Sequence, residues 1–491
     1  MIAWTFLSAF AGAALLLMLP PERKTLARVV ALVAAAAGFA GALGAFFLYD
    51  RGANAEAFQF VIDREWIPAL GIGFHLAADG ISLVLLLLTG LIAITGVLFS
   101  WNVDQSPKQF LALFLIIIGG AYGVFLSFDL FLLLVFYEIV ILPKYLLIAG
   151  WGSTNRSYGA MKLTLYSILG SALVLAAIMG TYVVAGIGSF NLFDLADVTY
   201  PPAFQAWAFP VMFLGFAVLA GLFPFHTWAP TGHVAAPTAA SMLLAGVVMK
   251  LGAYGALRVP MPLFPEGFEQ WRMVFAFLAA FGILYGALVA LAQRDLKFVI
   301  GYSSISHMGF VLLGLVTLTA IGIGGAVLQM FSHGIIAALL FGVVGRMIYD
   351  RTHTRELAAL NKLGLSRALP FAAVTFVIAS AASMGLPGFS GFIAEITILL
   401  GTWDSVPVLL FVVGPGIIIT VAFTLKALQL TFFGNETGQK AAPPLPPITW
   451  PEYTGAIILL ATTVAVGLYP SPLLDLILNS FDSILMESLL E

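Results

Sequence analysis

The sequence contains no cysteine, and only 9% of its 491 residues are Asp, Glu, Lys or Arg. The lack of cysteine excludes disulfides, iron–sulfur clusters and thiolate-bound zinc within this chain. We also find no glycine-rich phosphate loop, no nucleophile-and-base arrangement and no basic stripe suited to nucleic acid. We therefore expect no metal, no bound cofactor and no nucleic-acid partner for this chain itself.

Apolar residues are what the sequence has in abundance. They make up 61% of the chain, and the mean hydropathy is +1.05. No soluble domain has this composition, and the apolar runs are too long and continuous for the alternating strands of a membrane β-barrel. The sequence therefore predicts an all-α polytopic membrane protein.

Apolar runs of about twenty residues can cross a bilayer as helices. We expect about 14 such spans, and the first is long enough to stay in the membrane rather than be cleaved as a signal peptide. The spans lie near Ile2–Leu19, Val29–Leu48, Ile81–Phe99, Phe110–Ser127, Leu130–Ile148, Met161–Ala185, Trp207–Phe223, Ser241–Val259, Met273–Leu291, Ile300–Thr319, Ile323–Ile348, Leu369–Leu400, Val406–Phe432 and Tyr453–Leu468.

Two of these spans are interrupted by glycine and proline at matching places. Gly221 and Pro224 interrupt the seventh span, and Gly385 and Pro387 interrupt the twelfth. Kinks of this kind are common, but each break falls at nearly the same distance from the start of a five-span block. We therefore predict two five-helix repeats, spans four to eight and nine to thirteen, each with one broken helix. An odd number of spans makes the second repeat inverted, and paired broken helices point to ion sites in transporters.

The expected organisation has four parts: residues 1–105 with three spans, 106–260 with the first repeat, 261–434 with the second, and 435–491 with the last span. Lys and Arg are distributed unequally over the two sides, with 14 of the 21 on one side and four on the side of the termini. Because cytoplasmic loops are rich in Lys and Arg, both termini are expected on the outer, periplasmic side.

Five ionisable side chains fall inside spans: Glu138, Lys144, Lys250, Glu395 and Lys426. A charge at membrane depth costs about 2.5–3.5 kcal/mol on insertion scales, so such residues usually have a function. Glu138, Lys250 and Glu395 are interpreted as proton carriers, and Lys426 as structural. Lys144 lies about 120° from Glu138 on a straight helix, so two readings stay open: a bend at the preceding proline brings them together, or Lys144 extends to the membrane surface.

Four histidines accompany these groups. His307 and His333 lie between Lys250 and Glu395 in chain order, flanked by serines, which indicates a proton relay between the two. His226 and His233 border the break in the seventh span. They either line a cytoplasmic proton entrance or cap an irregular turn. No two histidines have metal-ligand spacing with a nearby acid.

Seven stretches, in this order, resemble the antiporter-like membrane subunits of respiratory complex I, in particular the subunit M family. Each stretch alone is a weak signal, but together they are specific and extend over nearly the whole chain. They are W-I-P-A-L-G-I-G-F-H-L-A-A-D-G-I-S-L from Trp66, F-Y-E ending at Glu138, H-V-A-A-P-T-A-A-S-M-L-L-A-G-V-V-M-K from His233, Q-R-D-L-K-F-V-I-G-Y-S-S-I-S-H-M-G-F from Gln293, S-H-G around His333, H-T-R-E from His353 and G-L-P-G-F from Gly385.

This resemblance implies a fourteen-helix fold and one proton moved by the subunit along a lateral axis of Glu, Lys, His and Glu. Glu138, Lys250, His333 and Glu395 match that axis. It also implies a non-redox subunit of an NADH:quinone oxidoreductase in a bacterial inner membrane. NADH, FMN, iron–sulfur clusters and quinone would bind other subunits, and antiporter-like subunits would flank this chain on both sides in the bilayer.

The chain departs from the family pattern at three positions. Leu219 stands where the family usually has a lysine that pairs with the glutamate of span five, and Lys144 stands where the family has an uncharged residue. We therefore expect that the amine has moved from one helix to the other and still acts on Glu138. Thr231 replaces an acid usually found two residues before His233, which weakens the case for proton uptake there.

Three other functions remain to be distinguished. A subunit of a multi-subunit Na⁺/H⁺ (Mrp-type) antiporter or of a membrane-bound hydrogenase would share this fold, but the stretch from Trp66 argues against it. A stand-alone secondary transporter would need a substrate-sized central cavity. A scaffold without transport fits poorly with five ionisable groups inside spans.

Overall fold

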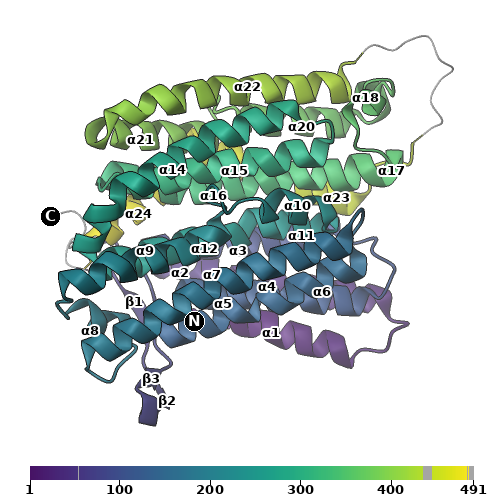
Figure 1. Cartoon of the computed structure of the whole chain (residues 1–491). Helices are drawn as coiled ribbons and strands as arrows, with labels where there is room; N and C mark the ends of the chain where they lie inside the picture. The colour runs from purple at the N-terminus through teal and green to yellow at the C-terminus, as the bar shows by residue number, and fades with distance from the viewer. Residues whose placement is uncertain (53–54, 435–444, 484, 486–491) are drawn as a thin grey trace.

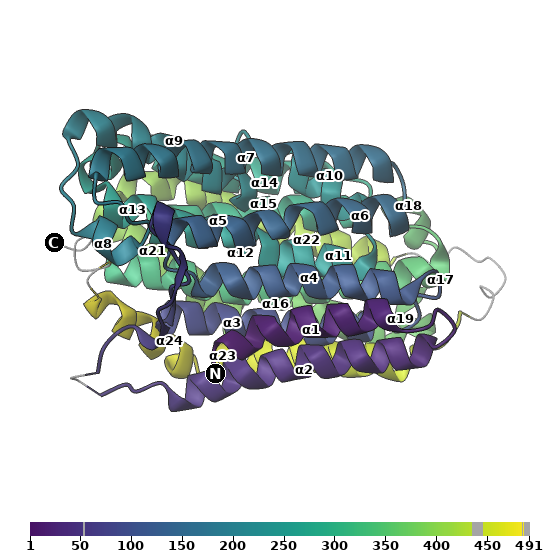
Figure 2. The same cartoon turned by 90° about the horizontal axis from the view of Figure 1, so that it is seen from below.

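The computed structural model describes residues 1–52, 55–434, 445–483 and 485. Its long helices run nearly side by side along one direction (Figures 1 and 2). Twelve helices of the described chain are long and apolar enough to cross a membrane, and two further apolar helices, Ala3–Met18 and Pro370–Ser383, are shorter. The prediction of a polytopic all-α membrane protein is thereby confirmed.

The N-terminal part has three helices, and two short β-sheets lie in the connection between the second and the third. β1 pairs with β4 and β2 with β3, both antiparallel, so the long connection before the third helix is two short sheets that the sequence analysis did not predict. The elements are α1 (Ala3–Met18), α2 (Lys24–Leu48), β1 (Gln59–Ile62), β2 (Glu65–Ile67), η1 (Pro68–Leu70), β3 (Ile72–Gly73), β4 (Leu76–Ala78) and α3 (Gly80–Phe99).

A first group of helices follows and includes the broken seventh span. Its long helices α7 and α9 pack against each other, and α12 packs on α9. The elements are α4 (Pro107–Leu126), α5 (Leu130–Ile139), α6 (Ile141–Trp151), α7 (Arg156–Ala185), α8 (Leu192–Ala196), α9 (Pro202–Ala220), α10 (Trp228–Ala235), α11 (Thr238–Leu243), the π-helical η2 (Leu244–Val248), α12 (Met249–Arg258) and α13 (Pro260–Leu263).

A second group repeats this pattern of long and broken helices, with α14 against α15 and α16 against α21. The elements are α14 (Pro265–Ala292), α15 (Leu296–Leu315), α16 (Ala320–Gly342), the π-helical η3 (Val343–Tyr349), α17 (Asp350–Thr352), α18 (Leu357–Leu360), α19 (Leu365–Ala368), α20 (Pro370–Ser383), α21 (Ser390–Ser405), η4 (Pro407–Leu409) and α22 (Leu410–Phe432).

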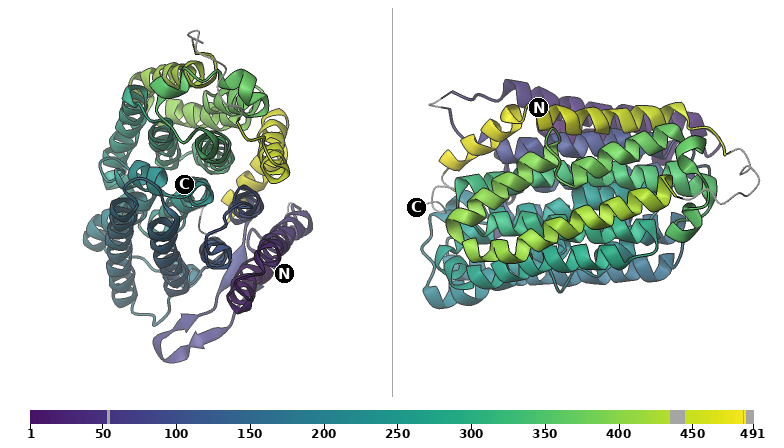
Figure 3. Two further views of the ribbon diagram at one scale, coloured as in Figure 1. Left: turned by 90° about the vertical axis from the view of Figure 1, so that its right-hand side faces the viewer. Right: turned by 90° about the horizontal axis from the view of Figure 1, so that it is seen from above.

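The chain ends with α23 (Trp450–Leu468), α24 (Ser471–Leu478) and η5 (Asn479–Asp482). Viewed along the helices, the α4–α12 group and the α14–α22 group occupy adjacent halves of the bundle, with α1 and α2 at its edge (Figure 3, left). The short helices α8, α13 and α24 lie at one end with the strands, and α17, α18 and α19 lie at the other (Figure 2).

The two predicted breaks have the same local structure. Gly221 ends α9 with φ +88°, and Gly385 follows α20 with φ +68°, a left-handed conformation that glycine adopts without a side-chain clash. The next residue then donates its N–H five residues back in both cases, from Leu222 to Ala217 O and from Leu386 to Ala381 O. This is the Schellman pattern of a helix C-terminus, so each break is a true helix end rather than a kink.

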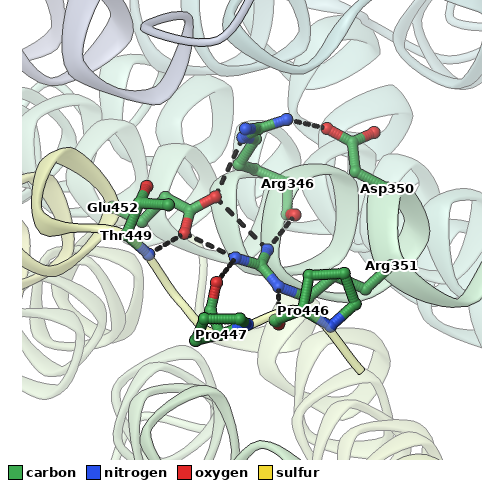
Figure 4. A network of polar contacts seen from close by, with 7 residues as sticks. All are labelled: Arg346, Asp350, Arg351, Pro446, Pro447, Thr449 and Glu452. Atoms are coloured by element: carbon green, nitrogen blue, oxygen red, sulfur yellow. Dashed lines mark hydrogen bonds and ion pairs between the residues drawn. The ribbon is translucent and has the colours of Figure 1, made fainter. Parts of the chain in front are cut away.

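A buried ion-pair network fastens α23 to the end of the eleventh span (Figure 4). The Glu452 carboxylate, 1% exposed, accepts two bonds from Arg351, at 2.7 and 3.2 Å, and one contact from Arg346 Nε at 2.9 Å. It also accepts the backbone N–H of Thr449, which completes a capping box at the start of α23. Arg351 further donates to two backbone carbonyls, those of Pro446 and Pro447.

Glu452 is the carboxylate that α23 contributes to the two guanidinium groups, and Asp350 also pairs with Arg346, so the charge of Glu452 is needed for the last span to dock. Removing one partner of a buried ion pair typically costs about 3–5 kcal/mol. We expect Glu452→Gln to loosen α23 and to lower the temperature at which the purified protein loses its structure. The exposed Glu22→Gln is the matched control and should leave that temperature unchanged. Equal melting of the two variants would contradict this role of the network.

Candidate functional site

Lys250 is the first residue of a connected polar line inside the bundle. It lies at the start of α12, directly after the π-helical η2, and its side chain is fully buried. Its Nζ donates to Ala245 O at 2.5 Å and lies 2.8 Å from His333 Nδ1 on α16. A π-turn leaves carbonyls out of the usual helical pattern and is frequent at functional sites, which suits an amine that needs partners away from water.

Two histidine rings and a carboxylate continue the line. The rings of His333 and His307 lie 5.4 Å apart between centroids. His307 Nδ1 is 3.1 Å from Glu395 Oε1, and its Nε2 is 3.1 Å from the hydroxyl of Ser383. Gln329 contacts the same carboxylate oxygen and the same histidine at 3.5 and 3.4 Å. Lys250, His333, His307 and Glu395 thus lie near one another, with His333 next to Lys250 and His307 next to Glu395, the reverse of the order of the two histidines in the chain.

Glu395 owes its position to the second break. It lies on α21, which begins at Ser390 just past Gly385, and a Cβ on Gly385 would come 2.7 Å from Glu395 Oε2. A cavity of about 10 Å³ lies beside it and is lined by both histidines and Gln329. This is close to the smallest volume that holds one water.

Lys144 and Glu138 lie apart from this line. Lys144 is 2% exposed, and its Nζ lies 3.4 Å from Ser167 Oγ on α7, so it points into the bundle and does not extend to the membrane surface. Glu138 lies within electrostatic range of Lys144. No hydrogen bond joins Lys144 to Lys250 among the described residues. Leu219, at the position of the expected family lysine, is buried, and the backbone there packs against Gly252.

Glu138 lies inside a predicted span, as a proton carrier would, but in the chain by itself its side chain is exposed on the surface of the bundle and not buried. The reason lies in helix geometry: Lys144 points inward, and a residue about 120° away on the same helix then points outward.

The two histidines at the first break have different surroundings. His226 stacks on Phe223, with centroids 5.5 Å apart, and meets Tyr285 edge-on at 5.0 Å. His233 is fully buried between Trp228 and Phe341. Neither ring nitrogen of either histidine has a hydrogen-bond partner among the described residues. Neither ring therefore caps a turn through a hydrogen bond within the described part of the chain, and a proton entrance at either histidine stays a prediction.

Lys426 lies outside the line, as the sequence analysis expected for a structural residue. It is exposed, and its Nζ donates to Leu291 O at 2.8 Å. Within the described ranges no group of three His, Asp or Glu side chains could hold a metal ion.

Sequence reasoning missed several polar residues around the line. Gln329 and Ser383 are uncharged and were passed over, although a glutamine in an apolar span is itself a signal. It also missed the buried ion pair of Asp79 and Arg258, in which Asp79 additionally caps α3 by accepting the Ser82 N–H at 2.8 Å. Arg258 lies in the last turn of α12, so the pair anchors the helix of Lys250 to the start of α3.

The chain is similar to known proteins over most of its length. A family model described as NADH:quinone oxidoreductase/Mrp antiporter, transmembrane, matches residues 127–422, which is more than half of the chain. The chain belongs to this family. It is 38% identical over 429 residues to NAD(P)H-quinone oxidoreductase chain 4 2 of Thermosynechococcus vestitus, covering 86% of this chain and 80% of that protein. It is 35% identical over 477 residues to NADH-quinone oxidoreductase subunit M of Rickettsia bellii, covering 95% and 94%.

Solved structures agree with this assignment. A chain of respiratory complex I from Thermus thermophilus with bound NADH matches with a TM-score of 0.89 at 29% identity, over 100% of both chains. A chain of the Mrp complex from Dietzia sp. matches with a TM-score of 0.84 at 21% identity, over 100% and 99%, which shows a common fold alone. The chain is an antiporter-like subunit of respiratory complex I, and the resemblance read from its motifs is confirmed.

The contact between Gly385 and Glu395 generates a prediction. Gly385→Ala should push the carboxylate away from His307 and slow proton transport by the assembled complex about ten-fold, since a 1 Å misplacement can cost that much or more. Gly388→Ala is the matched control, because Gly388 also has a left-handed φ, of +96°, but open space around its Cβ position. Proton uptake by membrane vesicles measures the effect. Equal slowing by both variants would attribute it to backbone strain alone.

Proposed function

We propose that this subunit moves protons along the buried line from Lys250 through His333 and His307 to Glu395. Two polar contacts, Lys250 with His333 and His307 with Glu395, carry this proposal, because a carrier must have partners within about 3 Å or one water to exchange protons. The two histidine rings lie 5.4 Å apart between centroids, so a water must bridge them. Redox chemistry in other subunits drives the transport, with NADH, FMN, iron–sulfur clusters and quinone bound there and no cofactor in this chain.

We also propose that the helices bearing this line belong to two inverted repeats. We assign the first repeat to α4–α12 and the second to α14–α22, within the segments 106–260 and 261–434. The identical C-terminal caps at Gly221 and Gly385 support this assignment, as does the packing of the helix after each break, α10 on α7 and α21 on α16. With α1 and the broken pair α20–α21 counted as spans, the chain crosses the membrane 14 times, and 1–105 and 435–491 flank the repeats.

The distribution of basic side chains supports an orientation in a bacterial inner membrane. Arg346, Arg351 and Arg355 lie in or near η3 and α17, at the end of the bundle opposite the strands (Figure 1). By the positive-inside rule this end faces the cytoplasm, and both termini lie on the periplasmic side.

The mechanism that fits this geometry is electrostatic. Lys250 Nζ and His333 Nδ1 are close enough to exchange a proton directly, and His307 can pass it to Glu395. Moving an attracting carboxylate away from a buried lysine favours loss of the lysine proton. Glu138 and Lys144 form a separate pair of opposite charges. In this pair Lys144 takes the place of the lysine that is missing at Leu219. Transport against the membrane potential costs about 2.3 kcal/mol per charge per 100 mV.

The exposed Glu138 indicates how the subunit assembles. A carboxylate at membrane depth is too costly to leave facing lipid, so another polypeptide covers this face. The neighbouring helices α6 and α7 also expose apolar side chains, among them Leu142, Leu146, Leu165 and Ile168. We infer that a neighbouring antiporter-like subunit docks here and supplies a hydrogen-bonding partner for Glu138. A second such subunit flanks the opposite side of the chain.

The alternative is a subunit of an Mrp-type antiporter, which shares the fold. The relatives with 35–38% identity are oxidoreductase subunits, whereas the Mrp chain is 21% identical. Co-purification with subunits that oxidise NADH distinguishes the two.

Replacing Lys250 tests the function directly. Lys250→Ala should abolish proton transport while the complex still assembles, because α12 remains anchored through Arg258. Lys426→Ala is the control: Lys426 also donates to a backbone carbonyl but lies outside the line. Acidification of membrane vesicles and native gels measure transport and assembly. Full transport by an assembled Lys250→Ala complex would contradict the proposal.

A further inference from the structure

A cavity at the end of the bundle that bears α17 has no role in the line described above. Its volume is about 180 Å³, enough for about six waters at the density of the liquid. It lies between the two halves of the bundle and is lined, among others, by Ser153, Thr238, Lys297, Asp350 and Arg355. In the proposed orientation it opens toward the cytoplasm.

Lys297 differs from the other charged residues of this cavity. Arg346 is paired with Asp350 at 2.5 Å, and Arg355 with Asp295 at 3.2 Å. Lys297 is 4% exposed, and its Nζ donates to two backbone carbonyls, at 2.7 Å to Ala236 and at 3.4 Å to Val234. In the described part of the chain no carboxylate lies within ion-pair distance of it.

The carbonyls that Lys297 contacts belong to Val234 and Ala236, which closely follow His233 in the chain. Both ring nitrogens of His233 are buried and lack a partner among the described residues, which is rare for a polar group unless it binds water or exchanges protons. Lys297 and Lys250 both lie within electrostatic range of its ring. His233 is thus near both the lysine at the cavity and the lysine that begins the buried line.

We propose that Lys297 is a further proton-transfer residue, which takes protons from water in this cavity and passes them through His233 to Lys250. One ring nitrogen of His233 accepts a proton from the Lys297 ammonium through a bridging water, and the other then releases a proton toward the neutral Lys250 amine. After these transfers Lys297 is reprotonated from the cavity water, so that Lys297 and His233 both return to their starting charge. This route rests on the proposed function of the line and replaces His226, which stacks among aromatic rings away from the cavity.

A simpler reading is that Lys297 only caps the carbonyls at the end of α10. That role needs only a hydrogen-bond donor, whereas proton transfer needs a side chain that can lose its proton. Arginine separates the two, because it stays charged in proteins and donates to carbonyls equally well.

The first test is Lys297→Arg in the assembled complex, with Lys426→Arg as the matched control. We expect normal assembly and a loss of proton transport of about ten-fold or more in Lys297→Arg, and no change in the control. If Lys297→Arg does not assemble, the smaller Lys297→Gln, which still donates to the carbonyls, should show the same loss. Normal transport in either variant would overturn the inference. A failed proposed function is distinguishable, since then Lys250→Ala would also transport normally.

The second test asks whether water reaches the cavity. The chain has no cysteine, so Thr238→Cys introduces one thiol in it, at a partly exposed position of the cavity wall. A membrane-impermeant thiol reagent should label it from the cytoplasmic side of the complex, and should not label Ser304→Cys, a buried control. A Thr238→Cys chain that stays unlabelled would mean a closed cavity and would also overturn the inference.

Discussion

Titratable side chains in the middle of a bilayer depend on hydrogen-bond partners that lipid cannot offer. This constraint decides where they lie in this chain. Lys250 has a carbonyl and a histidine, His307 has a carboxylate and a hydroxyl, and Glu395 has His307 and Gln329. All of them lie inside the bundle, where partners 3 Å away stand in for water. The exception is Glu138, and its exposure makes the chain incomplete without a neighbour.

The remaining structure serves to hold these partners in place. Each broken helix ends in the same capped glycine, so a carboxylate or histidine can stand next to a helix end at membrane depth. The pair of Asp79 and Arg258 fixes the outer end of the helix that bears Lys250. At the opposite end, Arg346, Arg351 and Glu452 fasten the last span. These charged contacts lie near the ends of the bundle, whereas the exchangeable groups lie between them.

Much of the fold could be predicted from the sequence because helices that cross a membrane need long apolar runs. Long apolar runs give the helices, and the glycine and proline pairs at 221–224 and 385–387 give the breaks. The presence of charged residues inside predicted spans identified Lys250 and Glu395 as candidate site residues. The features that could not be predicted depend on the rotation of each helix about its own axis and on contacts between helices. The outward direction of Glu138 follows from the phase of a helix, which no run of apolar residues encodes. Gln329, Ser383 and Arg258 matter only through the residues they meet across the bundle, and the cavity at Lys297 arises between segments far apart in the sequence.

We propose that one hydrated path joins Glu138 and Lys144 to the line from Lys250 to Glu395, because no direct hydrogen bond joins Lys144 to Lys250 among the described residues. An electron cryo-microscopy structure of the assembled complex that resolves ordered waters tests this most directly. The account predicts waters bridging Lys144 to Lys250 past Leu219, and further waters beside His307. Dry apolar packing between the two lysines would contradict it, because two insulated clusters cannot pass a proton.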